Sequence, residues 1–520
     1  MKVHLAYRDR DLDLETEPPA NAEALTQDLG LEILLGSMTR GDKYLYGVAR
    51  TTLFDGLHDP AEIRYRQAVL ADSLAHPDVV RELYAIAVAA LEGERHFWWH
   101  SERYPDSVLR GSVARIGAVV VQLRRLRDLA QEHLASFASE GFRRLFQELI
   151  DELGEAYLRS VDAHLRRLQF RSGVLLSATL GTTNLETAYV LRRRVEPRGW
   201  RERFGLPEAE SYSWELDPRD MAGNEALGML KGRGIAQAAG AVGESAEHIR
   251  GYLSQLRAEL GALIGCLNLH DALTAKGEPT CLPEPVPAGT TALSARGLYD
   301  ASLSLALGSA LAVGSDIDAD DMRLLVITGA NRGGKSTFLR SLGLAQLLLQ
   351  AGMFVPAETF RAEVRDGLFT HFKREEDADL RSGKLDEELG RMSAIVDQAR
   401  PGSLVLLNES FASTNEREGS EIARQIVRAL LESGIRIGYV THMYDLASSL
   451  EAEQNGEAAF LRAERLPDGR RTFRIVPGAP LPTSHGQDIY RRIFGDGAAV
   501  ARDAESTGVA VTEPERRPTS

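Results

Sequence analysis

One segment, residues 329–337, has the residue types and spacing that bind the phosphates of a nucleotide. The glycines let backbone N–H groups converge on phosphate oxygens, and a helix that begins here adds the favourable end of its dipole. We expect Lys335 to neutralise the β- and γ-phosphates and the Ser336 hydroxyl to bind Mg²⁺, which predicts ATP and Mg²⁺ as cofactors. The pattern G-x-x-x-x-G-K-[ST] is satisfied in full by Gly329, Ala330, Asn331, Arg332, Gly333, Gly334, Lys335, Ser336 and Thr337.

Hydrolytic chemistry is predicted downstream of this loop, where an apolar strand at residues 403–407 ends in Asn408 and Glu409. An enzyme with a phosphate loop needs an acid here to help hold Mg²⁺, and a second group to orient the attacking water. Glu409 fits the second role. Asn408 stands where an aspartate is expected and brings an oxygen ligand without charge, so we predict weak Mg²⁺ binding and slow turnover.

A third apolar strand, residues 436–440, ends in Thr441 and His442. In this order of elements His442 is predicted to sense the γ-phosphate, because three strand ends then present polar groups to one crevice. A structural histidine is the alternative. Gln350, just after the predicted phosphate-loop helix, is expected to belong to the nucleotide site and to report its state to the rest of the protein.

The predicted nucleotide-site residues must be positioned by an α/β fold, and the second half of the chain has the sequence pattern of such a fold. Residues 323–328 and 403–407 are short apolar runs suited to buried parallel strands. We assign residues 291–497 to a P-loop ATPase domain and residues 498–520 to a disordered tail. The preceding segment, residues 277–289, contains four prolines and no periodicity, which predicts a linker.

Residues 1–290 are predicted to be mainly helical, with a small β excursion at about 171–218. Strands are expected at 173–180 and 188–191, and a helix from Met221 to Leu273. This order describes an arm that runs out on helices, turns at a β tip and returns; a helical bundle with an inserted hairpin is the alternative. The helical spacing is carried by Val113, Ile116, Val120, Leu123, Leu126, Leu149, Leu153, Tyr157, Val161, Ile249, Leu253, Leu256, Leu260 and Leu263.

The composition narrows the class of protein. A chain of 520 residues is too long for one core, and its two cysteines, Cys266 and Cys281, exclude a disulfide framework. No apolar run approaches the roughly 18 residues that span a bilayer, and the start lacks the order of a signal peptide. We therefore expect a cytoplasmic protein with no membrane partner. The net charge of −14 argues against a simple electrostatic DNA binder, although a local basic patch can still bind DNA.

With these residues in hand, the chain resembles the MutS family of DNA mismatch-repair ATPases, a branch of the ABC ATPase superfamily. The resemblance is most specific over residues 328–446, where TGANRGGKSTFLR is similar to the family's TGPNMGGKST loop and THMYDL to its TH switch. QAGMFVPAE is similar to the segment after the loop helix, and Ser413-Thr414 with Glu416 and Gly419 to the TSTxDG loop. Weaker similarity covers MTRGDKYLYGVARTTLFDGLHDPAEIRYRQ and residues 482–486.

The resemblance implies a homodimer whose ATPase heads enclose two nucleotides and whose helical levers reach towards DNA. Residues 1–290 would be the core and lever region, with the β excursion where the family carries a clamp. Mismatch readers of the family begin with a mismatch-binding domain and a connector domain, and neither is expected in this chain.

The family's signature segment, Ser-Thr-Phe, which caps the ATP of the partner subunit, corresponds here to Gly383-Lys384-Leu385, with Glu388 following. Without the serine a γ-phosphate contact is lost. We predict that Lys384 supplies this contact in trans as a charge, and Ser382 is a partial substitute in another register.

The predicted DNA contact is a basic run at the tip of the arm, formed by Arg192, Arg193 and Arg194 with Trp200. Arginines pair with phosphates and an aromatic ring stacks on a base. A solvated charged loop is the alternative. A second cluster, Trp98-Trp99 between His96 and His100 with Glu92 on the same helix face, fits a stacking or metal site or, alternatively, simple helix packing.

Together these features predict a MutS-like, DNA-binding ATPase that acts in mismatch repair or recognises altered DNA structure through ATP-driven dimer switching. The alternative is an ABC-type ATPase whose helical arm remodels or tethers RNA, a ribosome or another protein without reading mismatches. The acidic charge and the missing mismatch-binding domain favour this alternative. A transporter subunit is disfavoured, because the helical region precedes the ATPase domain and the signature lacks LSGGQ.

Overall fold

The computed structural model describes residues 2–95, 104–171, 173–181, 186–192, 212–374, 383–453, 456–466 and 470–481. The chain forms two packing units. The helical unit comprises Met1–Glu17, Met38–Thr52 and Arg64–Asn268, and the head unit comprises Pro18–Ser37, Leu53–Ile63 and Leu269–Ser520. This division differs from the predicted boundary at residue 290, because two N-terminal segments and residues 269–290 pack with the head.

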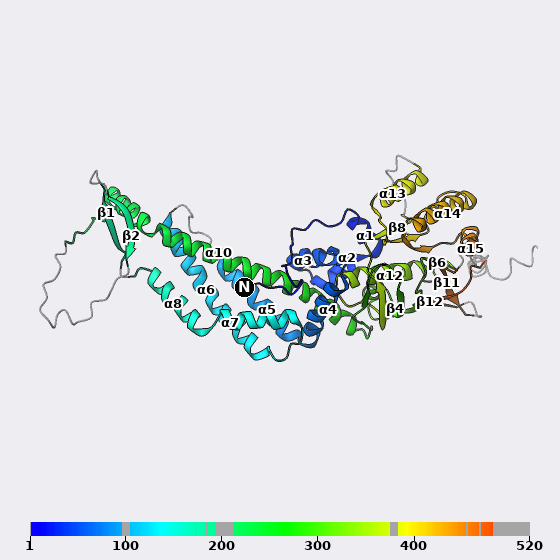
Figure 1. The fold of residues 1–520 in the computed structure, drawn as a ribbon, viewed down its shortest axis with the longest axis horizontal. Helices are drawn as coiled ribbons and strands as arrows, with labels where there is room; N and C mark the ends of the chain where they lie inside the picture. The colour runs from blue at the N-terminus through cyan, green and yellow to red at the C-terminus, as the bar shows by residue number, and fades with distance from the viewer. Residues whose placement is uncertain are drawn as a thin grey trace, which may run out of the picture. The chain divides into compact units, whose positions relative to one another are not determined.

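Long helices dominate the helical unit (Figure 1). Helix α6 packs against α5, α7 and α8. Pro105 starts α6 at a position where its missing N–H costs no helical hydrogen bond, and the Ser139 hydroxyl caps α7 by accepting from the Phe142 N–H. The main helices are α3 (Lys43–Phe54), α4 (Pro60–Ala75), α5 (Pro77–Arg95), α6 (Pro105–His133), α7 (Glu140–Glu152), α8 (Glu155–Leu168) and α10 (Met221–Thr274).

The predicted helical pattern is confirmed by burial along α6. Its apolar residues recur every three or four positions and turn one stripe towards the core. Tyr157 of α8 departs from the prediction, since its side chain is 57% exposed. The buried stripe of α6 contains Leu109, Val113, Ile116, Val120, Leu123 and Leu126.

The β excursion is an antiparallel hairpin of β1 (Leu175–Leu180) and β2 (Glu186–Arg192), with a register irregularity between Ser177 and Thr179. It lies at one end of α8 and α10 within this unit (Figure 1). Leu176 contacts Gly234 of α10 so closely that a Cβ at that glycine would overlap the leucine side chain. Helix α10 has 54 residues and is therefore about 80 Å long. The interpretation of this region as an arm with a β tip stays a prediction.

The N-terminal segment is held by a buried carboxylate on α10. Glu259 is 1% exposed and accepts hydrogen bonds from the backbone N–H groups of Leu5 (2.6 Å), Ala6 (3.0 Å) and Leu12 (3.0 Å). The Gln255 amide adds a fourth donor at 2.9 Å. Burial raises the pKa of Glu259, and these donors oppose the shift. Glu259 thus satisfies backbone groups of a segment that forms no helix or strand.

We predict that Glu259→Gln destabilises the helical unit by about 2–3 kcal/mol, because an amide nitrogen replaces one acceptor oxygen and leaves a buried N–H without a partner. Denaturant unfolding monitored by circular dichroism measures the change. Glu225→Gln, on an exposed turn of the same helix, is the control and should have no effect. Equal unfolding midpoints for Glu259→Gln and the parent would contradict the prediction.

The head unit contains a six-stranded sheet with the order β12-β11-β6-β10-β9-β8, parallel except for β12. The strands expected around residues 323–328, 403–407 and 436–440 are confirmed as β6, β9 and β10. Their near-complete burial explains their continuous apolar sequences. The six strands are β6 (Leu324–Thr328), β8 (Leu368–Phe372), β9 (Leu404–Asn408), β10 (Arg436–Val440), β11 (Ala458–Arg465) and β12 (Arg471–Pro477).

A smaller sheet of the head has the order β3-β7-β4-β5. Its strands are β3 (Glu284–Val286), β4 (Leu293–Leu298), β5 (Ser315–Asp318) and β7 (Thr359–Glu363). The predicted linker at 277–289 is therefore wrong in part. Pro285 sits in the edge strand β3, where a missing N–H is tolerated, and Cys281 pairs with Val355 outside the named strands.

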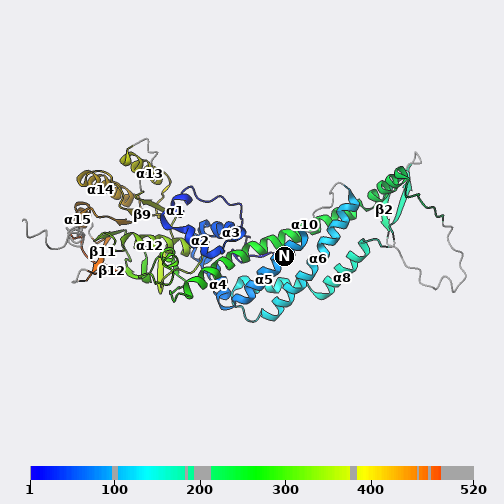
Figure 2. The ribbon, with the colours of Figure 1, turned by 180° about the vertical axis from the view of Figure 1, so that it is seen from behind.

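Helices cover both faces of the large sheet (Figure 2). On one face, Leu339 and Leu342 of α12 (Lys335–Gln350) lie against Gly438 of β10. The opposite face packs against α13 (Lys384–Gln398), α14 (Glu416–Glu432) and α15 (Tyr444–Glu453) in one apolar cluster. The head also includes α1 (Ala22–Leu29), most of α2 (Leu31–Thr39) and α11 (Ala301–Ala306). Asn21, just before α1, donates to the Leu368 carbonyl of β8 at 2.6 Å.

Candidate nucleotide site

The phosphate-loop segment joins β6 to α12 and is pressed against the β11–β12 hairpin. Gly329 and Gly334 have φ of +108° and +97°, which side-chain-bearing residues rarely adopt. A Cβ at Gly334 would lie 2.7 Å from the Phe473 carbonyl oxygen, and one at Gly333 would lie 2.7 Å from the Ala463 Cβ. The glycines are therefore required by close backbone approach as well as by the expected phosphate contacts.

Lys335 is the first residue of α12 and is only 4% exposed. Its Nζ donates to the carbonyl oxygens of Gly329 (2.7 Å) and Ala330 (3.3 Å) and to Asn331 Oδ1 (3.4 Å). Burial lowers the pKa of Lys335, and the Glu409 carboxylate opposes that shift. The ammonium group thus lies inside the curve of the loop at a helix N-terminus, the place where phosphate oxygens bind in such loops.

The sheet brings three polar strand ends side by side. Strand β10 lies between β6 and β9, and Val440 pairs with both Ile327 and Asn408. At this edge Ser336 Oγ donates to Asn408 Oδ1 at 2.9 Å, although 72 residues separate them. The two residues predicted to bind Mg²⁺ are therefore adjacent.

The ligand set of Ser336 and Asn408 fits a Mg²⁺ ion whose positive charge is balanced mainly by the phosphate oxygens of the nucleotide. Mg²⁺ is usually bound through one or two carboxylates together with substrate phosphates. Here the hydroxyl of Ser336 and the amide oxygen of Asn408 are both neutral. When bound, the ion would neutralise charge on the phosphates, while Ser336 and Asn408 hold it beside the loop.

We predict that Asn408→Asp lowers the Mg²⁺ concentration needed for half-maximal nucleotide hydrolysis by about tenfold, because a carboxylate adds charge to the ligand set. Ser336 keeps its acceptor in this variant. A Mg²⁺ titration at fixed ATP measures the change, and Asn408→Ala should shift the midpoint the other way. The same midpoint in all three proteins would rule out a role for residue 408 in ion binding.

Glu409 and His442 face each other across the ends of β9 and β10. His442 Nδ1 lies 3.8 Å from Glu409 Oε1. The His442 imidazole lowers the pKa of Glu409, with Lys335 contributing to the same effect and burial opposing it. Thr441, fully buried, accepts from the Met443 N–H at 3.0 Å, which shapes the turn that carries His442. An ionised carboxylate beside the phosphate loop can orient a water molecule and accept its proton.

Gln350 is placed at the other end of α12, about 22 Å along the helix from Lys335. It is buried, and its amide donates to the carbonyl oxygens of Leu57 and Arg365 and accepts from the Arg365 N–H. This placement argues against the predicted nucleotide contact. The sequence proximity of Gln350 to the loop was misleading because a sixteen-residue helix separates its ends.

The signature segment begins α13. Gly383 precedes the helix in an extended conformation, and Lys384 is exposed at its first position. Glu388, by contrast, is 5% exposed and accepts from the Ser413 hydroxyl at 2.8 Å within the same head. Its burial argues against the predicted contact with a partner's nucleotide. Ser382 lies outside the described residues.

Of the predicted DNA contact, the structure describes Arg192 alone. Its side chain is exposed, and its Nε donates to Ser177 Oγ across the hairpin at 2.9 Å. Arg193, Arg194 and Trp200 lie outside the described residues. The same holds for His96, Trp98, Trp99 and His100. Among the residues that are described, no group of three or more His, Cys, Asp or Glu side chains is arranged to hold a metal ion.

Comparison with known proteins bears on both units. Residues 58–276 match the MutS2 N-terminal domain, and residues 325–502 match MutS domain V. The chain belongs to the MutS family. The domain V match contains the phosphate loop with Asn408, Glu409 and His442, and the MutS2 match contains the long helices and the β1–β2 hairpin.

Individual MutS-family relatives match smaller parts of the chain. Endonuclease MutS2 of Thermomicrobium roseum is 32% identical over 211 residues, which are 39% of this chain and 26% of that protein. Endonuclease MutS2 of Thermus thermophilus is 32% identical over 171 residues, covering 33% and 23%. DNA mismatch repair protein MutS of Chloroflexus aurantiacus is 34% identical over 173 residues, covering 32% and 18%. The matched part of the chain thus spans 18% to 26% of the length of these relatives.

None of the described helices of this chain is both long and apolar enough to cross a membrane.

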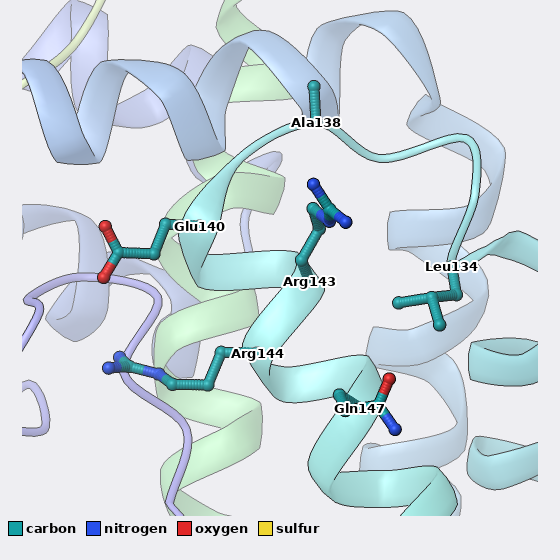
Figure 3. Close-up of a pocket in the computed structure, with 6 residues that line it drawn as sticks. All are labelled: Leu134, Ala138, Glu140, Arg143, Arg144 and Gln147. Carbon is teal, nitrogen blue, oxygen red and sulfur yellow. The ribbon is translucent and has the colours of Figure 1, made fainter.

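A hollow of about 520 Å³ lies beside α7 in the helical unit. It is lined in part by Arg143, whose side chain extends towards Ala138 (Figure 3). Its other charged residues are already paired, since Glu140 binds Arg8 and Arg144 donates to the Arg8 carbonyl. Two of the residues that line the hollow therefore contact the N-terminal segment.

Two buried residues behind Glu409 were not predicted from the sequence. His371 and Ser410 are fully buried and bonded to each other at 2.7 Å. The only sequence signal for His371 was a histidine inside the otherwise apolar and hydroxyl-bearing strand LFTHF. Residues that contact a ligand form recognisable sequence motifs. His371 and Ser410 instead support the site from the protein interior, and such residues form no motif.

Proposed function

We propose that this MutS-family chain hydrolyses ATP in the head and acts on DNA as a dimer, with nucleotide state controlling DNA binding. One observation carries the proposal. The ends of three adjacent parallel strands bring Lys335, Ser336, Asn408, Glu409 and His442 to one edge of the sheet. These groups supply the phosphate, metal and water contacts that phosphoryl transfer to water requires.

Each residue has a distinct part in the proposed reaction. Lys335 binds the β- and γ-phosphates, and the α12 N-terminus supplies further N–H donors. Glu409 orients the attacking water and accepts its proton, because its carboxylate stays ionised beside His442. His442 senses the γ-phosphate across the same crevice. We also propose that Lys384, exposed at the start of α13, completes the site of a partner head.

The experiment that tests the proposal is ATP hydrolysis by the full chain with homoduplex, mismatched, branched and single-stranded DNA, and with structured RNA. Stimulation by a DNA structure, together with ATP-dependent release or retention in a gel shift, is the expected result. Mismatch repair specifically requires a preference for the mismatched duplex over the homoduplex. No hydrolysis above that of a Glu409→Gln variant would overturn the ATPase proposal.

A second candidate function is favoured by the net charge of −14, which opposes DNA binding over most of the surface. In this alternative the ATPase remodels or tethers RNA or a ribonucleoprotein through its helical unit. Stimulation by structured RNA and by none of the DNA substrates would select it.

We predict that replacing Arg192, Arg193 and Arg194 with alanine weakens DNA binding and reduces the salt dependence of the affinity. Each lost phosphate contact lowers the slope of log K against log salt by about 0.9 for duplex DNA. Binding is measured by fluorescence anisotropy at several salt concentrations. A charge-matched control replaces Arg417, Arg424 and Arg428 of α14, which removes the same charge from the head. Equal slopes in the two triple variants would place the DNA contact elsewhere.

A further inference from the structure

The turn that carries Glu409 is strained. Glu409 and Phe411 have φ of +53° and +63°, and neither is a glycine. A backbone in this region costs on the order of 1–3 kcal/mol for each such residue, and it persists only where surrounding contacts hold it. Ser410 lies between the two residues and is fully buried. Ser410 is therefore placed to transmit contacts from the protein interior to this turn.

Three contacts hold Ser410 from behind. Its Oγ lies 2.7 Å from His371 Nδ1 and 2.8 Å from the His371 carbonyl oxygen, and its own carbonyl accepts from Tyr439 Oη at 2.8 Å. The His371 ring is also stacked on Phe411, with 5.4 Å between ring centroids and 20° between the planes. One imidazole thus contacts both residues that follow Glu409.

The hydrogen bonds define the tautomer of His371. Its Nε2 lies 3.0 Å from the Glu388 carbonyl oxygen, which only accepts, so Nε2 carries the proton. Burial, with Arg391 adding to it, lowers the pKa of His371 to about 4, so the ring is neutral near pH 7. In the neutral ring Nδ1 accepts, so the single proton of the Ser410 hydroxyl is shared between Nδ1 and the His371 carbonyl oxygen. Both nitrogens therefore have a partner, one in the Glu409 turn and one in α13.

We propose that His371 is a positioning residue for the ATPase: through Ser410 and Phe411 it holds the strained turn that keeps the Glu409 carboxylate in place for water activation. This inference rests on the proposed ATPase function. His371 lies on β8, where it pairs in register with Leu407 of β9. Its two ring nitrogens contact Ser410 and the Glu388 carbonyl oxygen, not residues of the phosphate loop. Its loss should therefore reduce turnover and leave ATP binding intact.

The test compares three replacements of His371 in the full chain. Asparagine places an amide near the position of Nδ1 and can accept from Ser410, whereas glutamine reaches the Nε2 position and can donate to the Glu388 carbonyl. Alanine does neither. Hydrolysis gives kcat and KM, ATP binding is measured by calorimetry, and hydrogen exchange reports the amides of residues 409–414. Ser410→Ala removes the same contact from the other side with a smaller change in volume.

We expect kcat to fall roughly 10- to 100-fold for His371→Ala, His371→Gln and Ser410→Ala, because displacements of about 1 Å at a reacting group have effects of this order. The KM for ATP should change less than about twofold, and exchange at 409–414 should accelerate in the same variants. His371→Asn should recover kcat to within about threefold of the parent, but only while Ser410 is present.

The outcomes separate the possible roles. Parent-like kcat and exchange in the alanine and glutamine variants would overturn the inference. Equal losses of kcat and ATP affinity in all three, without recovery by asparagine, would assign His371 to general stability and overturn it as well. If the parent hydrolyses no ATP but exchange at 409–414 still depends on Nδ1, the proposed function fails while the positioning contact stands.

Discussion

Lys335→Met should weaken ATP binding by at least about 2 kcal/mol, or roughly 30-fold, because it removes the cation from a buried phosphate contact. Lys335 is 4% exposed, and methionine keeps an apolar stem in its buried position, so the loop retains its packing. The substitution also removes the ammonium group that donates hydrogen bonds to the carbonyl oxygens of Gly329 and Ala330. Calorimetric titration with ATP measures the loss, and hydrolysis should fall with it.

A control for Lys335→Met is Lys231→Met in the helical unit, which removes a lysine from a surface pair with Asp106. This variant should bind ATP as the parent does. Parent-like ATP affinity in Lys335→Met would show that the segment 329–337 is not the nucleotide site, whatever its sequence pattern.

Glu409→Gln should leave ATP binding intact and reduce the rate of hydrolysis by roughly 10²- to 10⁴-fold, the usual range for loss of a general base. Glutamine preserves the size of the side chain and the turn that Ser410 holds. It removes the negative charge that lies 3.8 Å from His442. Single-turnover hydrolysis with prebound ATP isolates the chemical step, and Glu421→Gln on the exposed surface of α14 is the matched control.

The pH profile offers an independent check on Glu409. The pKa of its carboxyl is lowered from 4.5, first by His442 and further by Lys335. The carboxylate is present above its pKa and is lost as the pH falls through it, so the acid limb due to Glu409 should lie below pH 4.5. An activity loss that disappears in Glu409→Gln and is centred above pH 5 would contradict the assigned ionisation.

Much of the local structure was readable from the sequence because it depends on neighbours along the chain. Three apolar strands, the β1–β2 hairpin and the helix from Met221 follow from periodicity and turn residues. The phosphate loop is also local, since its glycines, lysine and serine act within nine residues. Prediction failed for the segment 277–289, whose prolines hid an edge strand that forms only against β7.

The residues of the nucleotide site likewise divide into those predicted by local sequence and those identified by contacts between distant parts of the chain. The loop at 329–337 and the polar strand ends at Asn408, Glu409 and His442 could be predicted from local sequence, because each is a short pattern with one chemical use. Which of these groups meet depends on the tertiary structure. The tertiary structure brings Ser336 into contact with Asn408 and places Gln350 at the end of α12 far from the loop. It also buries Glu388 and places His371 behind the turn that carries Glu409. Those contacts join residues that pack together across helices and strands, and hydrogen bonding between such distant positions leaves no spacing pattern in the chain.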